Sequence, residues 1–85
     1  MKRFEFWYVL PNKYPYDAVA HRHDLLLPYR HVAEYEQLKQ VERDELRTLK
    51  AAVLNSDYDY ILEAMPKNKS IPGHFHLHLI QAKAI

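Results

Sequence analysis

The fold of this chain is decided by one stretch near its C-terminal end, His74-Phe75-His76-Leu77-His78-Leu79-Ile80. Successive side chains of a β-strand point to opposite faces, so a strand here places three imidazoles on one face and apolar side chains on the other. The apolar face predicts a core strand that runs from His74 to about Ala82. The imidazole face needs a separate explanation, because histidine has only a weak preference for strands.

Two shorter strands are expected upstream of this stretch. The first runs from Phe4 to Leu10, where the side chains follow a period of two. One face carries Phe4, Phe6, Tyr8 and Leu10. The other face carries Trp7 and Val9. The segment from Lys13 to Arg22 has neither a strand nor a helix period and is predicted to be a loop. The next run, His23 to Leu27, is largely apolar and stops at Pro28, which favours a buried strand because the run is too short for three helical turns.

From His31 onward, apolar side chains recur at helical spacing among charged ones, which predicts an amphipathic helix that faces a sheet. A gap in this apolar stripe breaks the single register. We therefore expect a short turn at His31 to Leu38 and a main helix from about Val41 to Leu54, ended by Asn55. Alternation from Tyr58 to Ala64 predicts a third strand, and Pro66 to Gly73 is expected to be a loop.

The order strand, strand, helix, strand, strand leaves room for a helix only in the middle. It predicts an α+β fold, with an antiparallel sheet of about four strands and one main helix packed on one face. The 85 residues are expected to form a single domain, 1–85. A domain of this size buries only about 60 per cent of the surface that its unfolded chain exposes, so a second subunit would add to its stability.

Composition and charge exclude several classes of protein. The chain has no cysteine, which rules out a disulfide framework and a thiolate zinc site and suits a reducing cytosol. Its 12 basic and 11 acidic residues nearly balance and form no basic run, so a long nucleic acid is not an expected partner. No apolar stretch approaches the roughly 20 residues of a membrane helix, and no signal core begins the chain. We expect a soluble, cytoplasmic protein without a membrane partner.

The row of histidines allows three interpretations. The imidazoles could be scattered surface side chains. They could bind a metal, although same-face neighbours stand roughly 6.6 Å apart, so two rings could converge on one ion but three could not without a bend. A His-x-His pair with His23 as a distant third ligand is the metal site to consider. They could also be catalytic, because a neutral imidazole is nucleophilic near neutral pH and its neighbours can bind phosphate oxygens.

The pattern His-apolar-His-apolar-His-apolar-apolar resembles the defining motif of the histidine triad (HIT) superfamily, whose members hydrolyse or transfer nucleotides. The resemblance implies a short HIT-like fold. It also implies that His76 attacks an α-phosphate to form a nucleotidyl-histidine intermediate, flanked by His74 and His78. The attack itself requires no divalent metal and no cofactor.

Two other segments resemble the same superfamily. The stretch from His23 to Val32 matches its histidine, apolar run, proline and basic pair, which implies that His23 is a fourth active-site histidine. Asn12 and Pro15 match an Asn or Asp followed three residues later by proline, which implies a ribose contact from Asn12. An Asn at this position is equally typical of an Asx turn that closes the first strand. The run before the triad implies substrate contacts from Asn68 and Ser70, whereas His21 and His31 are not expected to be catalytic.

The function expected from this resemblance is that of a nucleotide phosphoramidase or dinucleoside polyphosphate hydrolase, acting on a purine mononucleotide conjugate or a dinucleoside polyphosphate. Two alternatives stay open: a nucleotide-binding module with weak turnover, and a histidine-based metal-binding protein. A homodimer is expected, because the edges of a small sheet are unpaired and members of the superfamily are commonly dimers.

Overall fold

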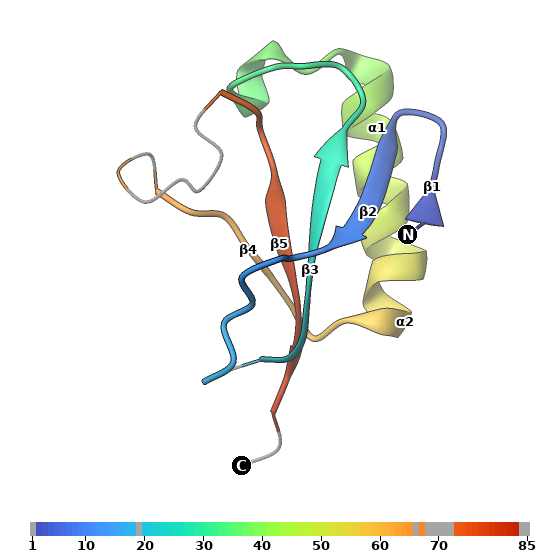
Figure 1. Cartoon of the computed structure of the whole chain (residues 1–85). Helices are drawn as coiled ribbons and strands as arrows, with labels where there is room; N and C mark the ends of the chain where they lie inside the picture. Colours follow the sequence, from blue (N-terminus) through green and yellow to red (C-terminus); the bar gives the residue numbers. More distant parts are fainter. Residues whose placement is uncertain (1, 19, 66, 68–72, 84–85) are drawn as a thin grey trace.

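The computed structural model describes residues 2–18, 20–65, 67 and 73–83. Across these residues it shows an α+β fold in which an antiparallel sheet of five strands packs against one main helix (Figure 1). The strands are β1 (Lys2–Arg3), β2 (Trp7–Pro11), β3 (Ala20–Pro28), β4 (Tyr60–Leu62) and β5 (Leu77–Ala82). Their order is β1-β2-β3-β5-β4, so β3 and β5 lie at the centre. The predicted α+β class and the antiparallel sheet are confirmed, and β1 is an additional strand.

The strand predicted from Phe4 to Leu10 corresponds to β2, which begins only at Trp7. Residues 4–6 form a turn between β1 and β2, in which the Phe4 N–H donates to the Trp7 carbonyl at 2.8 Å. The carboxylate of Glu45 on the helix accepts the Phe6 N–H at 2.8 Å and the Glu5 N–H at 3.2 Å. The prediction that Phe4 and Phe6 share a strand face with Tyr8 is therefore wrong, since the turn directs both phenylalanines towards the core beside Trp7.

The strand predicted from His23 to Leu27 corresponds to β3, which is longer than predicted. It begins at Ala20 rather than His23, because β5 continues to Ala82 and supplies a partner for Ala20. The ladder between β3 and β5 is irregular between Ala20 and Arg22. The predicted loop from Lys13 to Arg22 is correct only as far as the start of β3.

The main helix is more continuous than predicted. Its parts are α1 (Gln40–Leu49), a π-helical segment η2 (Lys50–Leu54) and α2 (Asn55–Asp57), preceded by a 3-10 turn η1 (Tyr35–Gln37). Asn55 does not end the helix as predicted, because its backbone stays right-handed and the Tyr58 N–H still donates to the Leu54 carbonyl at 2.9 Å. The wider π turn places Leu49 and Leu54, five residues apart, on the same buried side.

The two strands after the helix are shorter than predicted. β4 covers only three residues of the expected Tyr58 to Ala64, because Tyr58 turns towards the core and its hydroxyl donates to the carboxylate of Asp24. β5 joins its ladder at Leu77 rather than His74. Upstream of that point the Phe75 N–H donates to the Val32 carbonyl at 2.6 Å, so this part of the chain is held by the segment after β3 instead.

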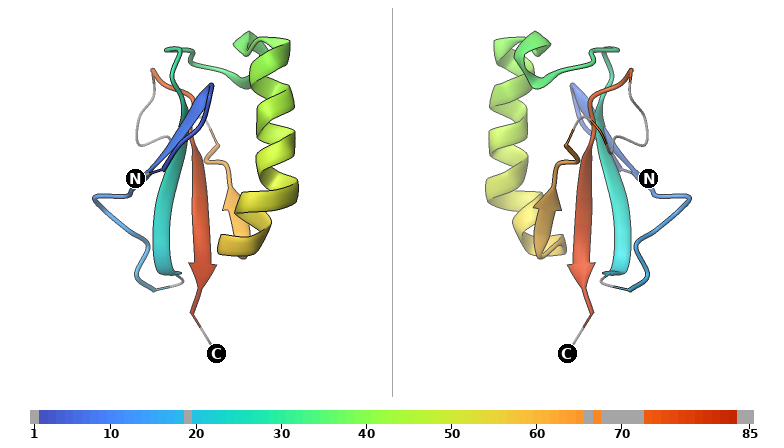
Figure 2. Two further views of the ribbon diagram at one scale, coloured as in Figure 1. Left: turned by 90° about the vertical axis from the view of Figure 1, so that its right-hand side faces the viewer. Right: turned by 90° about the vertical axis from the view of Figure 1, so that its left-hand side faces the viewer.

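The helix covers one face of the sheet, and the segment 12–18 lies on the opposite side (Figure 2). The core forms between the helix and the sheet. Its buried members are Trp7, Val9, Leu26, Val32, Leu38, Leu46, Leu49, Leu54, Phe75, Leu77 and Leu79. Among the described residues, no helix is long and apolar enough to cross a membrane.

Candidate active site

The register of the sheet places two histidines on the face away from the helix. His78 lies opposite Leu25 of β3, and His23 lies opposite Ile80 of β5. Directly paired residues of an antiparallel ladder share a face, so His78 and His23 are diagonal neighbours across the two central strands. Phe75, Leu77 and Leu79 belong to the core on the other face, which confirms the predicted apolar face of this stretch.

Three of the four candidate histidines form one cluster. The ring centroids of His23 and His78 are 4.9 Å apart, and those of His76 and His78 are 5.2 Å apart. His23, His76 and His78 are only 4%, 5% and 2% exposed, although they lie on the side of the sheet that the helix does not cover. The bland interpretation as scattered surface histidines does not fit side chains that are this deeply buried and in mutual contact.

His76 is held in a defined tautomer by the backbone. Its Nδ1 atom lies 3.0 Å from the carbonyl oxygen of His74. A carbonyl oxygen only accepts hydrogen bonds, so Nδ1 carries the proton and Nε2 of the neutral ring carries the lone pair. The arrangement therefore directs the nucleophilic character of His76 to Nε2.

A chain of hydrogen bonds orders the other two clustered rings. The backbone N–H of Tyr16 donates to Nδ1 of His23 at 3.0 Å, so the proton of the neutral His23 ring is on Nε2. That atom lies 2.7 Å from Nδ1 of His78. His78 must accept this hydrogen bond, which leaves its own proton on Nε2, a buried atom that has no hydrogen-bond partner among the described residues.

Burial keeps this pair of rings neutral. The low exposure of His78 lowers its pKa to about 4, and the neighbouring His23 and His76 act in the same direction. Burial likewise lowers the pKa of His23, opposed in part by the negative charge of Asp24. Both rings are therefore uncharged hydrogen-bonding groups at neutral pH, and His78 has a proton to offer to an acceptor.

His74 lies apart from this cluster. Its Nε2 atom donates to the Pro28 carbonyl at 3.0 Å, and its ring stacks on His31 with centroids 4.6 Å apart and an angle of 28° between the planes. The first member of the triad thus contributes its carbonyl oxygen to His76, while its imidazole is held by the end of β3 and by His31. His31 thus contacts the first histidine of the triad, and His21 is an exposed residue of β3.

Asn12 adopts the turn that its residue type allows. Its side-chain oxygen accepts the Tyr14 N–H at 3.0 Å, which is an Asx turn, and its amide nitrogen lies 3.2 and 3.4 Å from the two ring nitrogens of His23. Asn12 is therefore a neighbour of the cluster, and its contact with a sugar stays a prediction. Asn68 and Ser70 lie outside the described residues.

Sequence reasoning missed Tyr16. Its ring stacks on His78 at 5.4 Å between centroids and 21° between planes, and it also contacts His23 at 4.4 Å and 57°. It belongs to a segment without strand or helix period, so no periodic signal could have placed it. The available signal was compositional, because Tyr14 and Tyr16 flank Pro15 close to Asn12 in the sequence.

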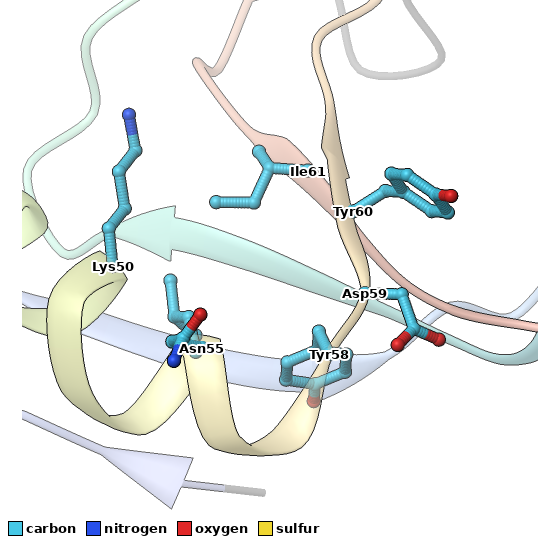
Figure 3. A pocket seen from close by; sticks show the side chains of 7 residues that line it. Lys50, Asn55, Tyr58, Asp59, Tyr60 and Ile61 are labelled. Carbon is cyan, nitrogen blue, oxygen red and sulfur yellow. The ribbon is translucent and has the colours of Figure 1, made fainter.

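The rest of the described chain carries no second histidine site. In the described part of the chain, no group of three or more His, Cys, Asp or Glu side chains could hold a metal ion. A pocket lies where the C-terminal end of the helix meets β4 (Figure 3). Its lining residues are Lys50, Leu54, Asn55, Tyr58, Asp59, Tyr60 and Ile61. No histidine lines this pocket, so it is separate from the cluster.

The fold and the cluster define an α+β protein with contacting imidazoles on one sheet face. No protein-family model and no curated protein sequence matches the chain. The resemblance to the histidine triad superfamily thus depends on the three sequence motifs.

Proposed function

We propose that this chain is a HIT-type nucleotide hydrolase or nucleotidyl transferase that acts at an α-phosphate through a nucleotidyl-histidine intermediate on His76. The observation that supports this most strongly is the contact of 3.0 Å between Nδ1 of His76 and the His74 carbonyl oxygen. It gives the central histidine the one neutral tautomer in which Nε2 can attack.

In the first step, the Nε2 lone pair of His76 forms a bond to phosphorus, and the bond from phosphorus to the leaving group breaks. The leaving group takes the electron pair and is protonated by solvent. The His76 ring, still protonated at Nδ1, then carries a positive charge, which the His74 carbonyl oxygen stabilises through its hydrogen bond. In the second step, water attacks phosphorus and releases one proton to solvent, while the P–N bond breaks with its electron pair returning to Nε2, so that the His76 ring is neutral again.

His78 and His23 would supply hydrogen bonding to the phosphoryl group. The buried Nε2–H of His78 is a donor that a phosphoryl oxygen would satisfy, and burial makes such a preplaced donor more effective than it would be in water. His23 sets the orientation of His78 through the contact of 2.7 Å between Nε2 of His23 and Nδ1 of His78. The substrate class proposed is a purine mononucleotide phosphoramidate or a dinucleoside polyphosphate.

The proposal is tested by turnover of adenylylated lysine and of diadenosine tetraphosphate. We expect His76→Ala to abolish release of AMP. His21→Ala is the matched control, since His21 is exposed, and it should retain full activity. Circular dichroism establishes that both variants fold. Equal turnover by His76→Ala and the wild-type chain would rule the mechanism out, and binding of AMP without any product would assign the same site to a nucleotide-binding module.

A further inference from the structure

Tyr16 lies against the rings of His23 and His78. Its ring is nearly parallel to that of His78, at 5.4 Å between centroids and 21° between planes, and its backbone N–H reaches Nδ1 of His23 at 3.0 Å. The same residue therefore contacts one ring with its side chain and the other with its backbone. It reaches them from the segment between β2 and β3, on the side of the sheet opposite the helix (Figure 2).

The contact from Tyr16 determines which way the hydrogen bond between His23 and His78 runs. An N–H group only donates, so the Tyr16 N–H makes Nδ1 of His23 an acceptor and places the His23 proton on Nε2. The next contact, 2.7 Å to Nδ1 of His78, then places the His78 proton on Nε2. The other donor near the His23 ring is the Asn12 amide nitrogen, which lies 3.4 Å from Nδ1 and 3.2 Å from Nε2 and so favours neither tautomer. Without the Tyr16 N–H, either ring of the pair could therefore donate to the other, and the pair would exchange between two tautomeric arrangements.

Only one of those two arrangements is useful for binding an anion. With Tyr16 in place, the buried Nε2 of His78 carries a proton and has no hydrogen-bond partner among the described residues. In the opposite arrangement, the same atom would present a lone pair, which repels a phosphoryl oxygen. A buried donor without a partner destabilises a fold, so its presence points to an acceptor that arrives with a ligand.

We propose that Tyr16 is a positioning residue that holds His23 and His78 in the tautomer in which His78 presents its Nε2–H to an anionic group. The role in turnover rests on the proposed function, whereas the control of the tautomers is a property of the protein without substrate. Among the described residues, the rings in contact with His78 are those of His23 in β3, His76 just before β5 and Tyr16 in the segment between β2 and β3. Loss of the Tyr16 ring would admit water to this cluster and remove the support for the N–H contact.

The test reads the tautomers directly by long-range proton–nitrogen NMR of the histidine rings in the free protein. We expect the wild-type chain to show protons on Nε2 of His23 and of His78, and on Nδ1 of His76. Tyr16→Phe keeps the ring and should leave this pattern unchanged. Tyr16→Ala should give averaged signals for His23 and His78, and should raise the pKa of His78 as water enters. Tyr14→Ala is the control, because Tyr14 is an exposed tyrosine of the same segment.

A second measurement adds inorganic phosphate as the probe. The Nε2 signal of His78 should shift on titration in the wild type and in Tyr16→Phe, and the shift should be lost in Tyr16→Ala. With substrate, kcat of Tyr16→Ala should fall by about tenfold, less than the loss expected when a transition-state donor is deleted outright.

Two results would overturn the proposal: a wild-type proton on Nδ1 of His78, which needs no variant to detect, or tautomers that are the same in Tyr16→Ala as in the wild type. The proposed function fails by a different result, namely turnover that does not depend on His76. The two failures are therefore distinguishable.

Discussion

The carbonyl oxygen of His74 lies 3.0 Å from Nδ1 of His76, so the first histidine of the triad acts on the second through its backbone. This contact predicts which ring nitrogen carries phosphorus in the intermediate. We expect an adduct trapped with adenylylated lysine to be linked through Nε2 of His76, because Nδ1 is occupied by its proton and its hydrogen bond.

Chromatography of an alkaline digest against the two isomers of phosphohistidine identifies the linkage. An adduct linked through Nδ1 would contradict the tautomer assigned here, even if turnover depends on His76.

Acid should destabilise the fold through His78. Its pKa is about 4 in the folded chain against 6.5 for the unfolded group, so the unfolded state binds the proton more strongly. The stabilisation is complete above pH 6.5 and is lost as the pH falls from there towards 4, by an amount of up to about 3 kcal/mol. His23 shifts in the same direction and adds to the effect.

Urea denaturation at pH values from 7 to 4.5 measures this loss. His78→Gln, which does not titrate in this range, should flatten the pH dependence, whereas the exposed His21→Gln should not. A wild-type free energy of unfolding that stays constant over this range would contradict the burial of a neutral His78.

Glu42 is a buried carboxylate whose removal should destabilise the fold. It is 2% exposed, accepts Arg30 at 2.8 Å and the Lys39 N–H at 2.6 Å, and these hydrogen bonds, that from Arg30 above all, lower its pKa. Glu42→Ala removes the carboxylate partner of the Arg30 guanidinium and the cap of the first helical turn. Because the Arg30 left behind is 42% exposed and stays hydrated, we expect a loss of about 1 kcal/mol in the free energy of unfolding, the size typical of a lost helix cap.

Chemical denaturation of Glu42→Ala checks this value, with Glu36→Ala as the control because Glu36 is exposed in the preceding 3-10 turn. Equal stability of the two variants would show that the ion pair with Arg30 contributes little.

The outer edge of β4 is the surface on which we expect a second copy of the chain to pair. Tyr60 and Leu62 on this edge strand are 61% and 44% exposed, and an edge strand presents unpaired backbone groups to a partner. We expect light scattering coupled to gel filtration to show a dimer, and Leu62→Lys to shift it to the monomer. Val41→Lys, at an exposed apolar position on the helix, should leave the dimer intact. A wild-type monomer at micromolar concentration would contradict the prediction.

Periodic patterns predicted the parts of the fold that are governed by a buried face. The alternation around Leu77 and Leu79 gave the core side of β5, and the helical stripe gave the helix, because burial of apolar side chains imposes both periods. The turn at residues 4–6 could not be predicted in this way. It depends on the Glu45 carboxylate, which is distant in sequence and carries no periodic signal.

For the candidate site, the sequence predicted which histidines belong to it but not all of their contacts. The motif named His23, His76 and His78; the sheet register brings His23 and His78 together, and His76 joins them through its ring contact with His78. The sequence did not indicate that His74 would stack on His31, nor that Tyr16 would cover the cluster, since both contacts arise from irregular segments whose paths depend on tertiary packing. Such segments have no periodic pattern of side chains from which their contacts can be predicted.

The late start of β5 has a consequence for motion within the triad. His78 lies inside the ladder with β3, whereas His76 precedes the first paired residue, Leu77. Amide hydrogen exchange should therefore be slow at His78 and markedly faster at His76, because local opening just before β5 leaves the pairing of β3 and β5 intact. The ring proposed to accept phosphorus thus lies just outside the strand ladder, whereas the ring that would bind oxygen lies within it.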